Sequence, residues 1–172
     1  MKTIEVLILH GSPGSGKTTL ARAIAEYLRA DDIAHAVIDP DDLSKIYPHP
    51  ERSFSLNNLK AIWPNYAAVP GLKVIVPAVI ADKENLEQLR DAMPAAKLVV
   101  CELTAPTAIL KDRVAAREPN EYWQKRLRGF VDLYQGRTDN QEIMDFQVAT
   151  HGKLIDNTAI EIIKKVGWKK NS

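Results

Sequence analysis

The chain has 172 residues, of which 23 are Lys or Arg and 22 are Asp or Glu, so its formal net charge is +1. A chain of this length can bury one core, and we expect residues 1–172 to form a single domain. The balanced charge argues against general binding to nucleic acid or an anionic membrane, and no apolar stretch is long enough to span a bilayer. The single cysteine, Cys101, excludes an internal disulfide, and no apolar signal region follows the N-terminus, so the sequence predicts a cytoplasmic protein.

The first predicted strand, Ile4–Leu9, leads into a segment that matches the phosphate-binding pattern G-x-x-x-x-G-K-[ST] at every fixed position: Gly11, Ser12, Pro13, Gly14, Ser15, Gly16, Lys17, Thr18 and Thr19. Glycines let backbone N–H groups turn inward around phosphate oxygens, and a helix predicted from about Lys17 points its positive end at the same anion. We expect Lys17 to bridge the β- and γ-phosphates of ATP and Thr18 to ligate Mg²⁺. The alternative is a glycine-rich turn that binds nothing. A match at all four fixed positions of the motif, directly after a buried strand, rarely arises by chance and argues against this alternative.

Five short β-rich runs alternate with helical patterns, which predicts an α/β fold in three layers, with helices on both faces of a parallel sheet. The runs are nearly continuous in Val, Ile and Leu, as strands buried on both sides are. Ligands of such sheets gather at the carboxyl ends of the strands, so we look for chemistry directly after each run. The predicted strands are Ile4–Leu9, Ile33–Ile38, Leu72–Val76, Leu98–Leu103 and Lys153–Ile155.

Two carboxylates follow the second predicted strand, in the sequence Asp39-Pro40-Asp41-Asp42. At this edge of the sheet they would face the γ-phosphate, where Asp39 is expected to hold magnesium or its waters and Asp41 to take a proton from an incoming hydroxyl. The alternative is that Asp41 or Asp42 only caps a short helix.

The segment from about residue 44 to 70 is predicted to cover the acceptor. It begins as a proline-rich loop and continues from Ser55 as an amphipathic helix interrupted at Pro64. Four of its side chains are candidates for an acceptor pocket, although the two aromatic ones suit a plain core role as well. These candidates are Asn58, Trp63, Asn65 and Tyr66.

Arginines concentrate after the fourth predicted strand. Arg113 and Arg117 lie at i and i+4 of one predicted helix, and Arg126, Arg128 and Arg137 follow in a second helical stretch. Such a group suits a lid, around residues 117–138, that closes over the transferring phosphoryl group and neutralises its charge. The alternative is a solvated helix face whose arginines pair with nearby carboxylates, namely Asp112, Glu118 and Glu121.

The C-terminal segment is predicted to be simple. Asp156-Asn157 ends the last predicted strand, and Thr158 with Glu161 has the spacing of a capping box for the closing helix.

Taken together, these motifs resemble the small-molecule kinases of the P-loop class: nucleotide and shikimate kinase-like proteins, adenylylsulfate kinases and antibiotic phosphotransferases. The phosphate loop, the Asp39-Pro40-Asp41 pair and the stretch from Leu103 to Arg117 carry the resemblance, and the ending Gly167-Trp168 resembles a bacterial group of ATPase or adenylylsulfate kinase-like proteins. The resemblance implies a strand order of 2-3-1-4-5, ATP with magnesium, arginines that approach ATP, and carboxylates shared between metal and acceptor.

The leading functional hypothesis is an ATP- and Mg²⁺-dependent phosphotransferase acting on a small hydroxylated or phosphorylated acceptor, as a monomer or homodimer. Lys17, Asp41 and Arg117 are its expected catalytic residues, residues 11–19 and Arg113 its nucleotide site, and Thr18 and Asp39 its metal ligands. A nucleotide-dependent regulatory ATPase without an acceptor is the rival. Processing of nucleic-acid ends is weakened by the absence of a basic stripe.

Overall fold

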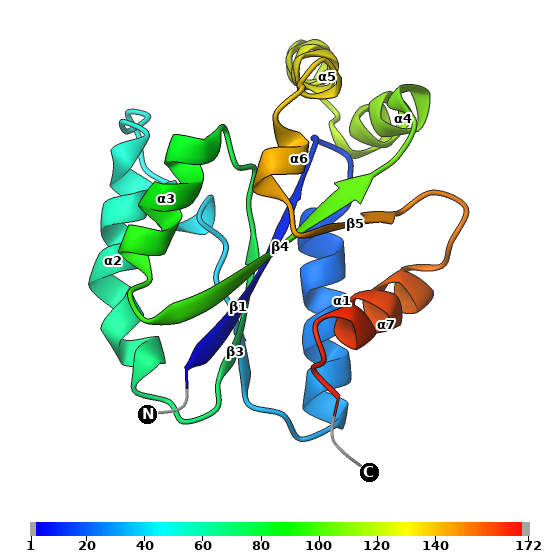
Figure 1. The fold of residues 1–172 in the computed structure, drawn as a ribbon. Helices are drawn as coiled ribbons and strands as arrows, with labels where there is room; N and C mark the ends of the chain where they lie inside the picture. Colours follow the sequence, from blue (N-terminus) through cyan, green and yellow to red (C-terminus); the bar gives the residue numbers. More distant parts are fainter. Residues whose placement is uncertain (1–2, 170–172) are drawn as a thin grey trace.

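A computed structural model describes residues 3–169 of the chain. Its centre is a five-stranded parallel sheet in the order β2-β3-β1-β4-β5 (Figure 1). This confirms the predicted α/β class, the parallel sheet and the strand order. The strands are β1 (Ile4–Gly11), β2 (His35–Val37), β3 (Lys73–Pro77), β4 (Ala96–Thr104) and β5 (Phe146–Ala149).

Helices cover both faces of the sheet, as the sequence predicts for strands buried on two sides. Helices α2 and α3 lie over one face, and α1 and α7 lie over the other (Figure 1). The helices are α1 (Lys17–Ala30), the 3₁₀ turn η1 (Asp42–Ser44), α2 (Ser53–Ala67), α3 (Lys83–Ala92), α4 (Thr107–Arg117), α5 (Glu121–Gln135), α6 (Asn140–Ile143) and α7 (Ile155–Lys165).

The pleat of the central strand divides the core in two. Val6 and Ile8 of β1 pack into the core under α2 and α3, whereas Leu7 and Leu9 pack into the core under α1 and α7. All four side chains are fully buried. Alternate residues of a strand point to opposite faces, so one apolar run supplies both cores and fixes the position of the loop that follows it.

A smaller apolar cluster joins α4 to α5 beside the carboxyl ends of the strands, where Figure 1 shows the two helices above the sheet. It contains Leu110 and Val114 of α4 and Val131 of α5. Helix α5 occupies most of the segment predicted as a lid, residues 117–138. The closing movement of that segment stays a prediction.

The fifth strand is not where the sequence analysis placed it. The prediction of Lys153–Ile155 is wrong: Phe146–Ala149 pairs with β4, from Cys101 opposite Phe146 to Thr104 opposite Ala149. As an edge strand it has only one fully buried residue, Val148, so it lacks the continuous apolar run that marks the central strands. Leu154, by contrast, is 72% exposed.

The predicted capping box is wrong for the same reason. Helix α7 begins at Ile155, so Thr158 lies inside the first turns, where its hydroxyl donates to the Leu154 carbonyl 3.2 Å away. The second strand is also shorter than predicted, His35–Val37 rather than Ile33–Ile38. None of the helices between residues 3 and 169 has the length and apolar character to cross a membrane.

Candidate active site

The phosphate loop connects the end of β1 to the start of α1, at the carboxyl edge of the sheet. Gly14 and Gly16 have φ angles of 79° and 94°, in the left-handed region that glycine adopts without strain. A Cβ on Gly14 would lie 2.6 Å from the Leu110 carbonyl oxygen, so no larger residue fits there. Gly16 is the N-cap of α1 and contributes no side-chain cap, which leaves the first N–H groups of the helix available to an anion.

Ser15 and Gly11 form the inner side of this loop. A Cβ on Gly11 would lie 2.6 Å from the Ser15 hydroxyl oxygen, so glycine is needed for the close approach. The Ser15 hydroxyl is buried and makes no hydrogen bond within the described part of the chain. A buried hydroxyl without a protein partner is costly unless a ligand satisfies it. The loop therefore has the shape and the unused hydrogen-bonding capacity that phosphate oxygens require.

Lys17 turns back over the loop that it follows. Its Nζ donates to the carbonyl oxygens of Gly11 and Ser12, each 2.9 Å away. Desolvation, reinforced by the positive charge of Arg117, lowers the pKa of Lys17 to about 8, while Asp41 and Asp39 act in the opposite direction. Lys17, Arg117, Asp39 and Asp41 are thus close enough for their charges to interact. The sequence analysis predicted each of them as a site residue from a different motif.

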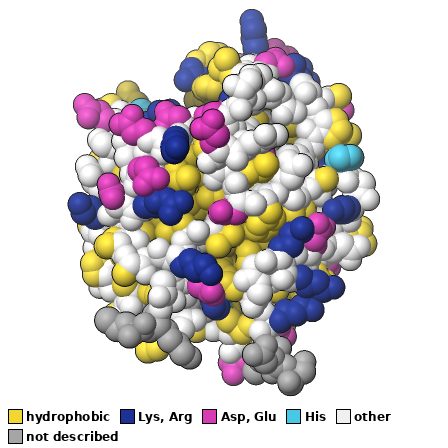
Figure 2. Space-filling view, viewed as in Figure 1, with side chains coloured by type: hydrophobic (Ala, Val, Ile, Leu, Met, Phe, Trp, Pro, Cys, Tyr) yellow, Lys and Arg dark blue, Asp and Glu magenta, His cyan; other side chains and the backbone are white. Residues whose placement is uncertain are grey.

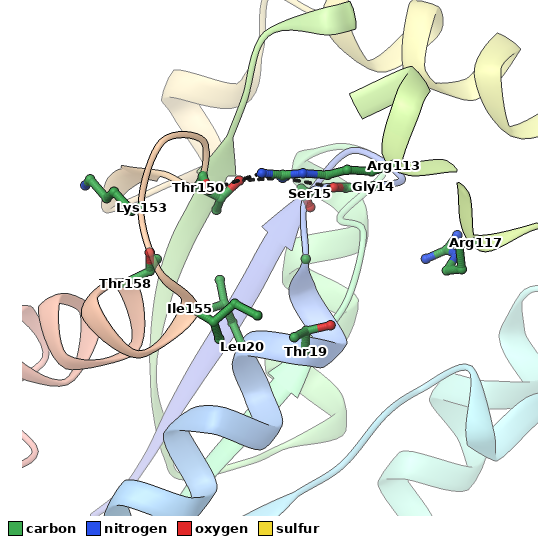
Figure 3. Close-up of a pocket in the computed structure, with 11 residues that line it drawn as sticks. Gly14, Ser15, Thr19, Leu20, Arg113, Arg117, Thr150, Lys153, Ile155 and Thr158 are labelled. Atoms are coloured by element: carbon green, nitrogen blue, oxygen red, sulfur yellow. Dashed lines mark hydrogen bonds between the residues drawn. The ribbon is translucent and has the colours of Figure 1, made fainter. Parts of the chain in front are cut away.

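A cavity of about 320 Å³ adjoins the loop on the side of α4 and α7 (Figure 3). Arg113 crosses its upper wall: its guanidinium donates to the Gly14 carbonyl at 3.3 Å, to the Thr150 hydroxyl at 2.9 Å and to the Thr150 carbonyl at 3.1 Å. Figure 3 shows Arg117 apart from this cluster, on the side of the loop away from Thr150. Arg117 also pairs with Glu118 at 3.3 Å, as its alternative interpretation anticipated.

Four residues of this first cavity were missed by the sequence analysis, because they follow the strand that was misplaced. They come from the loop after β5 and the start of α7: Thr150, Lys153, Ile155 and Thr158. Functional residues of parallel sheets follow the strands, so these four residues could have been predicted only if the fifth strand had been placed correctly.

A second cavity, of about 260 Å³, lies on the other side of Lys17 and Thr18. It contains both predicted carboxylates, Asp39 and Asp41, at the end of the strand β2 segment. Its other walls come from the start of α2, the loop after β3, and α3, where the sequence shows no chemical motif. The lining residues that sequence analysis missed include Arg52, Ser55, Leu56, Asn85 and Leu89.

The two carboxylates are arranged differently. Asp39 accepts a hydrogen bond from the backbone N–H of Asp41 at 3.0 Å, and burial raises the pKa of Asp39 against the effect of that bond. Asp41 stands at the N-cap of η1 but its carboxylate makes no cap hydrogen bond, so the capping alternative is wrong for its side chain. Asp42 pairs instead with Lys45. The Asp41 carboxylate is exposed and adjoins the cavity.

The acceptor-pocket candidates of α2 have other surroundings in the structure, and only the two aromatic residues belong to the core. Asn58 donates to the Leu43 carbonyl at 2.8 Å, and Trp63, only 1% exposed, donates through its ring nitrogen to the Pro94 carbonyl at 3.1 Å. Tyr66 packs against the same core, and Asn65 is exposed. None of the four lines the second cavity, and the core interpretation of the two aromatic residues is confirmed.

The more distant arginines do not reach either cavity. Arg137 pairs with Asp139 at 3.0 Å and donates to the Ile80 carbonyl at 2.6 Å, and Arg126 stacks over Trp123 and Phe130 on α5. Neither they nor Arg128 line the first or the second cavity. The predicted arginine cluster is therefore reduced to Arg113 and Arg117 in this structure.

A buried polar network connects the end of β1 to the loop after β3 and to α5. His10, directly before the phosphate loop, accepts from the Ile80 N–H at 2.9 Å through Nδ1, and its Nε2 lies 3.1 Å from both Asn140 Oδ1 and the Tyr134 hydroxyl. Tyr134 in turn donates to Glu102 at 2.9 Å. Burial lowers the pKa of His10 to about 4, so the ring is neutral at physiological pH. No sequence motif predicts this network, which links β1, β4, α5 and the loop after β3.

The sheet order, the glycine loop at the end of β1 and the lysine folded over it define a P-loop protein with the fold of the small-molecule kinases. A family model agrees with this class: AAA_33, described as an AAA domain, matches residues 6–132. The chain belongs to this family. No curated protein gives a significant match to the sequence.

Solved structures of similar fold include small-molecule kinases and a resistance protein. The APS kinase CysC of Mycobacterium tuberculosis, in complex with AMPPNP and APS, superposes with a TM-score of 0.70 at 20% identity, over 97% of this chain and 99% of that one. The shikimate kinase of Acinetobacter baumannii, in complex with shikimate, gives 0.60 at 17% identity, over 98% and 95%. The tunicamycin resistance protein of Deinococcus radiodurans gives 0.65 at 16% identity, over 95% and 96%. The resemblance drawn from the sequence is thus confirmed at the level of fold.

Proposed function

We propose that the protein is an ATP- and Mg²⁺-dependent phosphotransferase that moves the γ-phosphoryl group of ATP to a small hydroxylated or phosphorylated acceptor. The observation that carries the proposal is the pair of cavities on either side of the phosphate loop, with Lys17 and two carboxylates at the second one. A nucleotide switch needs only the first cavity. A kinase needs a second, beside the γ-phosphate, with a group that can accept a proton.

The first cavity and the loop suit a nucleoside triphosphate. The N–H groups at the start of α1, the Ser15 hydroxyl and Lys17 would bind the phosphates. Arg113 of α4 donates to the Gly14 carbonyl and so holds α4 against the phosphate loop. Thr18 and Asp39 would hold magnesium, a hard cation that prefers oxygen ligands and phosphates. When bound, ATP with magnesium supplies an activated phosphoryl group whose charge the metal partly neutralises.

Transfer needs little from the protein beyond positioning and charge. Asp41 takes the proton of the acceptor hydroxyl as that oxygen forms its bond to the γ-phosphorus, and the electron pair of the broken bond leaves with the β-phosphate of ADP. Lys17 and Arg117 would stabilise the charge on the transferring group. Desolvation is the main cause of the lowered pKa of Lys17, and the positive charge of Arg117 adds to it.

The proposal also covers the cellular location of the protein and the kind of molecule it binds. We place the protein in the cytoplasm, because its one cysteine is a buried, protonated thiol, the pKa of which burial raises to about 12. Basic and acidic side chains intermingle on the face shown in Figure 2, which supports a small acceptor rather than nucleic acid.

The test is a screen of candidate acceptors for ADP release above the rate with water alone, with identification of the phosphorylated product. Lys17→Ala protein serves as the blank, since contaminating kinases would act equally in both preparations. We expect at least one hydroxylated compound to raise ADP release several-fold, in stoichiometric amounts with its phosphate ester. ATP hydrolysis at one constant rate with every compound would instead favour the regulatory ATPase.

A further inference from the structure

The lining of the second cavity separates into three chemical kinds. Asp39 and Asp41, at the carboxyl end of β2, supply hydrogen-bond acceptors and negative charge. Leucine, valine, alanine and proline side chains supply an apolar wall. Lys17 and Thr18 also line the cavity, and the proposed transfer chemistry uses both. The remaining polar groups come from the start of α2 and from α3. Because the proposed transfer chemistry does not use these last groups, they bear on the identity of the acceptor.

Arg52 is the charged member of this third group. It precedes the first residue of α2, and its side chain lines the cavity. Among residues 3–169 no carboxylate oxygen lies within 4 Å of its guanidinium, and it makes no hydrogen bond there. A planar guanidinium without a protein carboxylate, at the wall of a small cavity, matches a carboxylate or phosphate in two parallel hydrogen bonds.

Asn85 contributes a donor as well. Its side-chain Oδ1 accepts from the Ala81 N–H at 3.1 Å, and its own backbone N–H donates to Asp82 at 2.8 Å, so the orientation of the amide is fixed by the cap of α3. The Nδ2 group makes one long contact, 3.4 Å, to Gln88. The amide therefore offers N–H rather than C=O to a ligand. Ser55 in the first turn of α2 adds a hydroxyl.

We infer that the acceptor is a small organic anion, a hydroxylated molecule that carries a carboxylate or phosphate group, and that Arg52 determines this specificity. The inference rests on the proposed function and names its substrate class. Asp39 and Asp41 repel the anionic group and favour the hydroxyl, whereas Arg52, Asn85 and Ser55 donate to the anionic group, so the acceptor has one orientation. A volume of about 260 Å³ is below the roughly 300–1,000 Å³ of pockets for drug-sized ligands and suits a molecule of monosaccharide size.

The experiment compares matched pairs that differ in the anionic group: glycerate with glycerol, gluconate with sorbitol, and glucose 6-phosphate with glucose. Wild-type protein, Arg52→Gln and the control Arg29→Gln are assayed for transfer from ATP. Arg29 is an exposed residue at the end of α1 that pairs with Glu26, so the control removes a positive charge far from the second cavity. In parallel, binding of each compound is measured by calorimetry with the phosphate loop saturated by a non-hydrolysable ATP analogue.

We expect transfer and binding only with anionic members. Arg52→Gln should raise KM for them by about 10- to 100-fold, the usual worth of a charged hydrogen bond, with kcat little changed and with Arg29→Gln like wild type. Transfer to a neutral member at equal or greater kcat/KM, or an unchanged KM in Arg52→Gln, overturns the inference while the kinase proposal stands. Arg52-dependent binding of an anion without any transfer keeps the inferred anion site and overturns the kinase proposal. Absence of both binding and transfer across all three pairs counts against both.

Discussion

The first cavity, which we propose for the nucleotide, takes its phosphate loop from one short segment, residues 11–20. The second cavity, which we propose for the acceptor, is assembled from segments between residues 17 and 89. In the first, the backbone dihedral angles of a glycine loop and the start of one helix place the donors, so the geometry is local. In the second, β2, α2 and α3 must all pack correctly before Asp41, Arg52 and Asn85 face one space. A substitution outside the glycine loop therefore leaves the phosphate-binding geometry intact. A substitution in any one of β2, α2 or α3 can change which ligand fits the second cavity.

The largest expected effect tests the local side. Lys17→Ala should reduce turnover by about 10³–10⁵, the range in which a single charge on the transferring phosphoryl group acts, and should weaken ATP binding. Folding should persist, because the lysine bonds only to loop carbonyls. Turnover and nucleotide binding by calorimetry are the measurements. Unchanged values for both would remove the phosphate-loop assignment.

The next effect tests the composite side without disturbing the local one. Asp41→Asn keeps shape and hydrogen bonding but removes the base, so transfer should fall by about 10²–10⁴ while ATP affinity is retained. Asp39→Asn is the matched control: as a poorer magnesium ligand it should raise the magnesium concentration needed for half-maximal rate. Transfer assays across magnesium concentrations separate the two. If Asp41→Asn transfers phosphate at the wild-type rate, Asp41 only positions its neighbours.

Arg117 lies where the two sides meet and should give a smaller loss. Its charge acts on Lys17, yet its side chain is 60% exposed and its pairing with Glu118 adds little stability. We expect Arg117→Ala to lower kcat by about 10²–10³ with a nearly unchanged melting temperature. Thermal unfolding and kcat measured on the same preparation decide the matter. A large drop in melting temperature with normal activity would make Arg117 structural.

The smallest effect concerns the buried network around His10, where we expect a change in stability. The pKa of His10 is about 4 in the folded protein against an ordinary value of 6.5, so between these values the unfolded chain binds more protons. Stability should therefore fall as pH drops from 6.5 toward 4, with about 3 kcal/mol at the limit due to His10. Urea unfolding across this range, compared with His10→Gln, isolates the contribution, because only the wild type has the histidine. Parallel pH profiles for the two proteins would show that His10 does not titrate as described.

The sequence by itself determined four of the five strands and the position of the phosphate loop. Nearly continuous apolar runs such as Ile4–Leu9, alternating with helical patterns, predict strands buried on both faces. The glycine pattern up to Lys17 favours one loop conformation through backbone sterics that act between neighbours. The carboxylates Asp39 and Asp41 were found as well, because the ends of parallel strands share one edge of the sheet.

Only the tertiary structure decided what lies around them. The edge strand Phe146–Ala149 has one buried residue and gains its conformation from hydrogen bonds to β4, so its local pattern could not mark it. Trp63 and Arg52 both belong to the α2 region, yet packing turned the tryptophan to the core and left the arginine at the cavity. His10 forms hydrogen bonds with Tyr134 and Ile80, which lie 124 and 70 residues away in the sequence. Contacts of this kind depend on how separate elements pack, and the order of residues along the chain carries no local record of them.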